Sequence, residues 1–213
     1  MSAPLFTVIN TFTLKNPADA EEFERRFLDH VQWMRRQEGF QAHQAVRATE
    51  ESAVYVNLGW WTTPQDFQRV LASETFQAHA KEFHQVVDVE ADPSLSVLRV
   101  DAADAAAVAA GERPLVVIER FTVTGDTEPF EAAYRAYAEV AAGADGFGHT
   151  DLAKSLKRPG GYTAATRWSG EAARESARAT PEYAALLALA TPVALATAPV
   201  AGNRAPAEPA RRG

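Results

Sequence analysis

The chain has 213 residues, of which 46% are hydrophobic and 23% charged, with a net charge of −7 and no cysteine. This composition excludes a wholly disordered chain, and the lack of cysteine excludes disulfides, zinc–thiolate sites and a cysteine nucleophile. The acidic balance argues against nucleic acid or an anionic membrane as a partner. Neither an apolar run of about 18 residues nor a signal peptide is recognisable, so we expect a soluble, cytoplasmic protein.

The elements of the first half can be taken in chain order. A strand is expected at 5–14, and Asn16-Pro17 then starts a helix that ends at Gly39. Strands at 40–48 and 53–61, a helical region at 67–87 and a strand at 95–100 follow. The order β-α-β-β-α-β is that of ferredoxin-like folds.

The second half repeats the first. Four landmarks keep a constant offset of 107 residues, namely Phe23 with Phe130, Gly39 with Gly146, Trp61 with Trp168, and Phe76 with Tyr183. We therefore expect a first domain at 1–100, an Ala-rich linker at 101–113, a second domain at 114–201 and a disordered tail at 202–213. The repeated elements are strands at 115–123, 147–155, 161–168 and 193–200, and helical segments at 128–141 and 171–189.

Strand 54–61 is apolar on both faces, and such a strand needs cover on both. Helices cover one face, and the matching sheet of the other copy is the natural cover for the second. The predicted fold class is therefore α+β, with two tandem ferredoxin-like units packed sheet to sheet as an intramolecular dimeric α+β barrel. This is a pseudo-dimer within one chain; whether two chains pair further into a homodimer is left open.

Two asparagines interrupt apolar strand faces. Asn10 shares its face with Val8 and Phe12, and Asn57 shares its face with Tyr55, Gly59 and Trp61. A buried amide without a partner costs roughly 1–3 kcal/mol, so each must be hydrogen-bonded to its surroundings or used.

Gly59 leaves room for something flat beside Asn57 and Trp61, although a bulge glycine next to a core tryptophan explains the pattern too. The functional interpretation is a pocket for a flat aromatic molecule with phenol or carbonyl groups. Tyr55, Gly59 and Phe27 are its predicted lining.

Asn10 in VINTF, with Asn57 and Trp61 in NLGWW, resembles the pattern of the antibiotic-biosynthesis monooxygenase family. More narrowly, it is similar to that of the quinone-forming anthrone oxygenases. The resemblance implies that these three residues are catalytic, and that the substrate is a polycyclic aromatic polyketide oxidised from anthrone or phenol to quinone. It also implies dioxygen as co-substrate with no metal or other cofactor required. A hydroxylase or ring-opening oxygenase that uses diffusible reduced flavin is the alternative.

The second copy departs from this pattern. Ala164 stands at the position of Asn57 and Glu119 at that of Asn10, while Trp168 is kept. The resemblance then implies one working pocket per chain. Glu119 lies on an apolar strand face, where a carboxylate has a raised pKa unless it is paired. A buried ion pair with an arginine and a general acid/base are its two interpretations.

The histidines give further candidates. His79 lies at the edge of an apolar helix stripe and is a candidate for proton transfer, whereas His30 is interpreted as a boundary residue and His43 as an exposed or interface strand position. A heme-degrading enzyme is disfavoured, because Val70 and Ala80 stand where that subfamily has tryptophan and histidine. Two alternatives to an oxygenase stay open: a polyketide cyclase or isomerase that uses Glu119 or His79, and a small-molecule binding protein.

Overall fold

The structure is a computed structural model that describes residues 4–102 and 115–206. It divides into two compact units. Unit 1 is built from the chain up to Pro93 and from Pro199 onward, and unit 2 from Ser94–Ala198. Within the described residues, no helix is long and apolar enough to cross a membrane.

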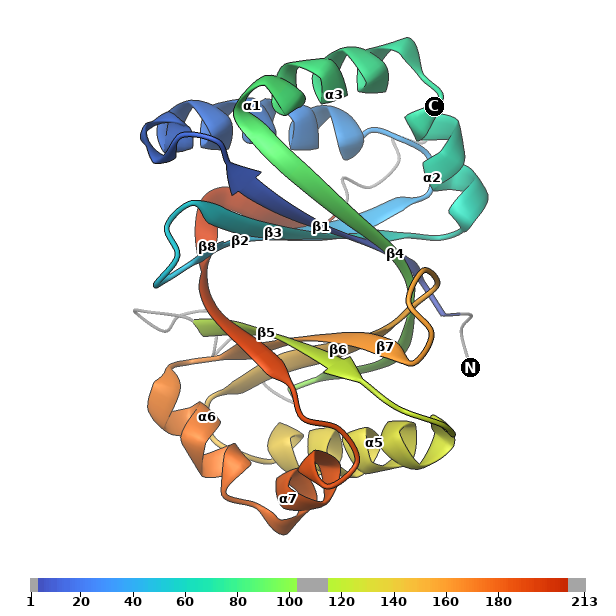
Figure 1. The fold of residues 1–213 in the computed structure, drawn as a ribbon, viewed down its shortest axis with the longest axis vertical. Helices are drawn as coiled ribbons and strands as arrows, with labels where there is room; N and C mark the ends of the chain where they lie inside the picture. Colours follow the sequence, from blue (N-terminus) through green and yellow to red (C-terminus); the bar gives the residue numbers. More distant parts are fainter. Residues whose placement is uncertain (1–3, 103–114, 207–213) are drawn as a thin grey trace. The chain divides into compact units, whose positions relative to one another are not determined.

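Unit 1 carries three strands, three helices and a short 3-10 turn of its own (Figure 1). They are β1 (Phe6–Leu14), η1 (Pro17–Asp19), α1 (Ala20–Met34), β2 (Phe40–Ala48), β3 (Val54–Trp61), α2 (Pro64–Leu71) and α3 (Glu74–Val86). Unit 2 repeats the pattern with β5 (Leu115–Thr122), α5 (Glu128–Ala142), β6 (Phe147–Ser155), β7 (Gly161–Trp168), α6 (Glu171–Arg178) and α7 (Pro181–Leu187). Two longer strands, β4 (Val87–Asp101) and β8 (Val193–Pro206), are each divided between the units.

The strands are hydrogen-bonded in one closed order, β1-β3-β2-β8-β5-β7-β6-β4. Each repeat thus supplies four strands to a closed antiparallel barrel, and the predicted fold class of two ferredoxin-like units in a dimeric α+β barrel is confirmed.

The domain limits of the structure differ from the expected ones. The expected limit at residue 100 lies inside β4, whose last part from Ser94 pairs with β6 in unit 2. The expected tail from Gly202 begins inside β8, which continues to Pro206. Residues 103–114 of the linker region and 207–213 of the tail lie outside the described residues.

Local sequence signals account for the helix starts of unit 1. Asn16 accepts a hydrogen bond from the Ala18 N–H at 3.1 Å, and Pro17 occupies the first position of the turn that leads into α1. The hydroxyls of Thr63 and Ser73 cap α2 and α3 in the same way. The region predicted as helical at 67–87 is therefore two helices, because Ser73 starts a new one.

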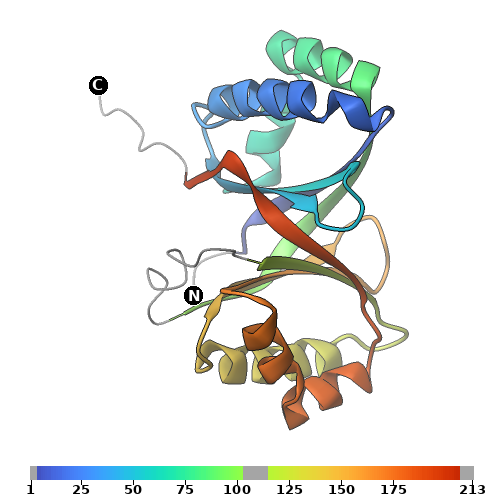
Figure 2. The same cartoon turned by 90° about the vertical axis from the view of Figure 1, so that its left-hand side faces the viewer.

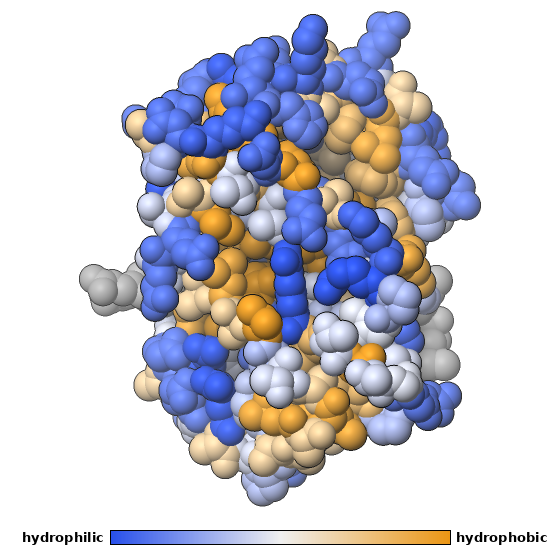
Figure 3. All heavy atoms as spheres, viewed as in Figure 1, coloured by the Kyte–Doolittle hydropathy of each residue, from blue (hydrophilic) through white to orange (hydrophobic). Residues whose placement is uncertain are grey.

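Helices α1 and α3 lie side by side over one face of the unit 1 strands in both ribbon views (Figure 1, Figure 2). An aromatic cluster fills part of the space beneath them: Phe12 lies 5.4 Å from Phe23, 5.5 Å from Phe27 and 6.4 Å from Phe83 between ring centroids. The outer surface over these helices is mostly hydrophilic (Figure 3), as expected for amphipathic helices.

Candidate functional site

The register of the unit 1 strands brings the predicted residues together. Asn10 on β1 lies directly opposite Asn57 on β3, and Val8 lies opposite Gly59 in the same pairing. On the other side of β3, His43 of β2 lies opposite Gly59. Because directly opposed residues point to the same face of a sheet, the two amides, the glycine and the imidazole share one face.

This face borders a cavity of about 400 Å³ in unit 1. Asn10, Asn57, Gly59 and Trp61 all line it, and so do Phe27 and His43. The remaining wall is largely apolar. Strands β1, β2 and β4 contribute to it, and so do the three helices, through Val31, Met34, Phe67, Leu71, Phe76 and Phe83. An apolar cavity of this size with a few converging polar groups is typical of a site for a small organic molecule.

Gly59 keeps the space between two hydrogen-bond donors open. A Cβ atom at this position would lie 3.7 Å from Nε1 of Trp61 and 3.9 Å from Nδ2 of Asn57. A larger side chain would therefore occupy the place where the indole and amide N–H groups converge. The prediction that Gly59 opens room beside Asn57 and Trp61 agrees with this geometry.

Several polar atoms of the cavity have no hydrogen-bond partner among the described residues. Oδ1 of Asn57 is buried without a hydrogen bond, and neither ring nitrogen of His43 makes one of good geometry, within the described residues. A ligand with hydroxyl or carbonyl groups can hydrogen-bond to these atoms.

His43 is the site residue that the sequence missed. The prediction of an exposed or interface position was wrong: the side chain is 3% exposed and lines the cavity. Burial lowers its pKa to about 4, an effect that the neighbouring Asn57 amide opposes, so the imidazole is neutral at pH 7. The misleading signal was Arg47 on the same face, whose guanidinium reaches Glu24 at 3.4 Å.

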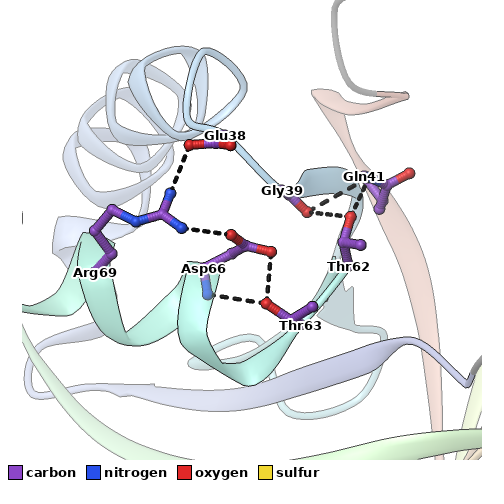
Figure 4. A network of polar contacts seen from close by, with 7 residues as sticks. All are labelled: Glu38, Gly39, Gln41, Thr62, Thr63, Asp66 and Arg69. Carbon is purple, nitrogen blue, oxygen red and sulfur yellow. Dashed lines mark hydrogen bonds and ion pairs between the residues drawn. The ribbon is translucent and has the colours of Figure 1, made fainter.

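A polar network fixes the start of α2 beside the cavity (Figure 4). Thr63 Oγ1 accepts from the Asp66 N–H at 3.2 Å and donates to Asp66 Oδ2 at 2.7 Å. Arg69 bridges Asp66 Oδ1 at 2.7 Å and Glu38 Oε2 at 2.9 Å. The network anchors α2 to the turn before β2, and α2 in turn holds Phe67 5.5 Å from the ring of Trp61.

Two predicted residues lie outside the cavity wall. Tyr55, a predicted lining residue, is buried and donates its hydroxyl to Glu24 Oε1 at 2.6 Å. It lines a separate crevice of about 10 Å³ with Phe23. His79 does not line the cavity either, but its Nδ1 lies 2.9 Å from Nδ1 of His30, which does.

Glu119 lies in unit 2, in the place that Asn10 has in unit 1. It is 5% exposed and lies directly opposite Ala164 of β7. It accepts a hydrogen bond from the Tyr183 hydroxyl at 3.2 Å. Burial raises its pKa, while Tyr183, Arg174 and Arg178 oppose that rise. Within the described residues, Glu119 forms no ion pair with an arginine. Its carboxylate is instead hydrogen-bonded to Tyr183.

At three positions equivalent to cavity-lining residues of unit 1, unit 2 carries side chains with hydroxyl groups. Thr166 stands 107 residues after Gly59, Thr150 after His43, and Tyr134 after Phe27. These three form one hydrogen-bonded row, with 2.7 Å between Tyr134 and Thr150 and 2.8 Å between Thr150 and Thr166. All three are at most 2% exposed.

The sequence comparison agrees with this repeat. The model of the family described as antibiotic biosynthesis monooxygenase matches residues 5–82 and again residues 114–189. The chain belongs to this family. Both matched segments of the family fold are therefore present in tandem in one chain.

Individual relatives are more distant. Deoxynogalonate monooxygenase from Streptomyces nogalater is 37% identical over 75 residues, which are 35% of this chain and 61% of that protein, so less than two thirds of its length is spanned. A candidate monooxygenase from Lactobacillus acidophilus shares the fold at 11% identity with a TM-score of 0.72, over 97% of this chain and 100% of its own. An anthrone oxidase-like protein gives a TM-score of 0.65 at 17% identity, over 97% of this chain and 94% of its own.

Proposed function

We propose that unit 1 is a monooxygenase that converts a polycyclic aromatic substrate of the anthrone or phenol type to a quinone with dioxygen. The observation that carries the proposal is the cross-strand pair of Asn10 and Asn57 beside the Trp61 indole in a largely apolar cavity. The relative named deoxynogalonate monooxygenase, whose match lies in a third of the chain, supports an oxygenase rather than a binding protein.

The proposed oxidation requires only the substrate and dioxygen as reactants, without a metal ion or a flavin. Loss of a proton from the anthrone methylene leaves an enolate, which is electron-rich enough to pass one electron to dioxygen. The substrate radical and the superoxide formed in this step combine to a peroxide. Loss of the second methylene hydrogen then expels water. The carbon has lost two hydrogens and gained one oxygen atom, and the other oxygen atom leaves as water.

The residues of the cavity stabilise the negative charge that develops on the enolate and on the peroxide during this reaction. The Nδ2–H groups of Asn10 and Asn57 and the indole N–H of Trp61 are neutral donors suited to an enolate oxygen or a peroxide. Oδ1 of Asn57, which has no hydrogen-bond partner among the described residues, can accept from a phenolic hydroxyl of the substrate. The apolar wall holds the rings flat and excludes bulk water, which strengthens these hydrogen bonds.

Dioxygen uptake by metal-stripped, flavin-free protein tests the proposal, with dithranol as a model anthrone and the protein-free rate subtracted. The expected result is uptake with quinone formation that falls about 10- to 100-fold in Asn57→Ala, the range for a lost hydrogen bond to a charged group. Glu119→Gln, the change of the buried polar residue at the equivalent face of unit 2, is the matched control and keeps the wild-type rate.

Other outcomes point elsewhere. Uptake only after addition of reduced flavin supports the flavin-dependent alternative. No uptake in either condition, with turnover of a polyketide that depends on Glu119, supports a cyclase or isomerase. Tight binding of the aromatic molecule without any product supports a binding protein.

A further inference from the structure

Two histidines from different helices of unit 1 meet in an unusual contact. Nδ1 of His30 on α1 and Nδ1 of His79 on α3 lie 2.9 Å apart, with the two rings nearly perpendicular at 83°. A hydrogen bond between two Nδ1 atoms requires that one ring carries its proton there and the other does not. The Nε2 atom of each ring is then left for a second partner.

The pair lies between two spaces of different character. His30 lines the apolar cavity that holds Asn10 and Asn57, and it also lines a groove of about 530 Å³ between α1 and α3. His79 lines the groove only. We call this space the charged groove, because its other lining side chains include Glu22, Arg25, Arg26, Asp29 and Glu82.

The charged groove is open to water. The side chains of Arg25 and Asp29 are 63% and 73% exposed and form an ion pair at 3.5 Å. Glu22 is paired with both arginines, at 2.9 Å to Arg25 and 2.7 Å to Arg26. Glu82 on α3 is exposed three residues after His79, on the same side of that helix.

We propose that His30 and His79 form a proton relay, which takes the proton from an aromatic substrate in the cavity and delivers it to water in the charged groove. The proposal deepens the proposed function and rests on it, because it names the acceptor of the proton that the methylene or phenol group loses. Neutral asparagine amides cannot fill that role.

Each transfer is balanced. The relay starts with a proton on Nδ1 of His30 and a proton on Nε2 of His79. The C–H or O–H bond of the substrate breaks, its electron pair stays on the substrate as the enolate, and the proton binds Nε2 of His30. The Nδ1 proton of His30 passes to Nδ1 of His79, and the Nε2 proton of His79 leaves to water.

Return of a proton resets the pair. After the first transfer, His30 carries its proton on Nε2 and His79 carries its proton on Nδ1. When dioxygen has added, the peroxide anion takes the Nε2 proton of His30, His79 passes its Nδ1 proton back, and water reprotonates Nε2 of His79. The original tautomers are restored without rotation of either ring.

The electrostatics of His30 agree with this role. Burial, with a smaller contribution from the neighbouring His79, lowers the pKa of His30 to about 3. The ring is therefore neutral at pH 7, and it takes up the substrate proton only as it releases its Nδ1 proton to His79. A positive charge is unfavourable on it, so a proton received from the substrate is passed on to the exposed side.

The first test is the state of the two rings in solution. Long-range ¹H–¹⁵N spectra of the labelled full chain at neutral pH are expected to show two neutral rings, one protonated on Nδ1 and the other on Nε2. The Nδ1 proton is expected to disappear in His79→Ala. Two rings that are both protonated only on Nε2 would overturn the relay.

The second test is turnover of dithranol. His30→Gln is expected to lower kcat about 100-fold and His79→Ala about tenfold, with KM within about twofold, as for removal of a general base and of its partner. Added imidazole is expected to restore several-fold activity to His79→Ala, which a merely structural defect would not allow. Lys81→Ala, an exposed change two residues further along α3, is the control and keeps the full rate.

The outcomes separate the two proposals. A wild-type protein without oxygen uptake overturns the proposed function, and the relay with it. An active wild type whose His30→Gln and His79→Ala variants keep their turnover overturns the relay alone.

Discussion

At the scale of single residues, Asn57 combines two features that rarely occur together. It lies in the middle of a strand with an apolar neighbour on each side in sequence, Val56 and Leu58. Its Oδ1 is buried with no hydrogen-bond partner in the part of the chain that the structure describes. The proposed function gives this atom a partner, a hydroxyl group of the substrate.

Trp61 can be divided into a packing role and a hydrogen-bonding role. Its ring lies 5.2 Å from Phe40 and 5.5 Å from Phe67 between centroids, contacts that phenylalanine can partly keep. We expect Trp61→Phe to lower kcat about tenfold through loss of the indole N–H, with a small change in Tm. A large fall in Tm with unchanged kcat per folded molecule, measured by thermal melting and oxygen uptake, would make the residue structural instead.

The lowered pKa of His43 predicts that the free energy of unfolding depends on pH in the acid range. Its pKa is lowered from 6.5 to about 4 by burial, so the unfolded chain binds this proton more tightly than the folded one does. The free energy of unfolding should therefore fall as the pH drops from 6.5 to 4, with His43 contributing on the order of 2–3 kcal/mol. His30 acts in the same direction, with a pKa of about 3.

Urea unfolding of the wild type and of His43→Gln across this pH range measures the effect. The variant is expected to show a flatter dependence of stability on pH, because glutamine does not titrate. Parallel curves for the two proteins would contradict the burial argument.

At the scale of elements, α2 depends on the network around Asp66. The hydroxyl of Thr63 and the charge of Arg69 lower the pKa of Asp66, so the folded state favours the carboxylate. Its stabilisation is present above about pH 4 and is lost as the pH falls below that value. Gly39 belongs to the same contact, because its φ of 81° and the closeness of Asp66 leave no room for a side chain.

Asp66→Asn should therefore lower the free energy of unfolding at pH 7 by about 1 kcal/mol, since it weakens the contacts to Thr63 and Arg69. Glu38→Gln, which changes the exposed end of the same network, is the control and should have a smaller effect. Chemical denaturation at pH 7 and pH 3 measures both, and the difference between Asp66→Asn and wild type should shrink at pH 3. An equal difference at both pH values would contradict this role of the carboxylate.

Strand periodicity predicted the core of the site but not its limits. The alternation of side chains placed Asn57, Gly59 and Trp61 on one face of their strand and Asn10 on an apolar face of another, because a regular pleat fixes such relations within a strand. The pairing of Asn10 with Asn57 came from the register of β1 and β3. The alternation also placed Tyr55 on the face of Asn57, yet the hydroxyl turns to Glu24, which no pattern within the strand encodes. The contact between His30 and His79 joins residues 49 positions apart on two helices, and helix periodicity alone does not set such a pair.

At the scale of the whole molecule, the tandem repeat was readable because its aromatic landmarks keep one offset. The division of β4 and β8 between the two units was not, since a strand has the same alternation wherever its hydrogen-bond partners lie. The departure of the second copy from the Asn10 and Asn57 pattern was readable in Glu119 and Ala164. The hydrogen-bonded row of Tyr134, Thr150 and Thr166 required the structure.

The hydrogen-bonded row of Tyr134, Thr150 and Thr166 in unit 2 leads to a prediction about transferring the two asparagines to that unit. Introducing Glu119→Asn and Ala164→Asn together restores the amide pair of unit 1 in unit 2, but not the space beside it. We expect no gain in turnover, and no turnover when the graft is combined with Asn57→Ala. Recovered activity in that combined variant, measured by oxygen uptake, would show that side chains do not close the second copy.

Unit 1 alone is proposed to insert an atom of dioxygen into an aromatic substrate. Incubation of metal-stripped, flavin-free protein with dithranol under ¹⁸O₂, followed by mass spectrometry of the quinone and subtraction of the protein-free reaction, tests this proposal most directly. One ¹⁸O atom per quinone formed is expected, with the yield sharply reduced in Asn57→Ala and unchanged in Glu119→Gln. A quinone without the label, or a labelled yield that depends on Glu119 and not on Asn57, would contradict the proposal.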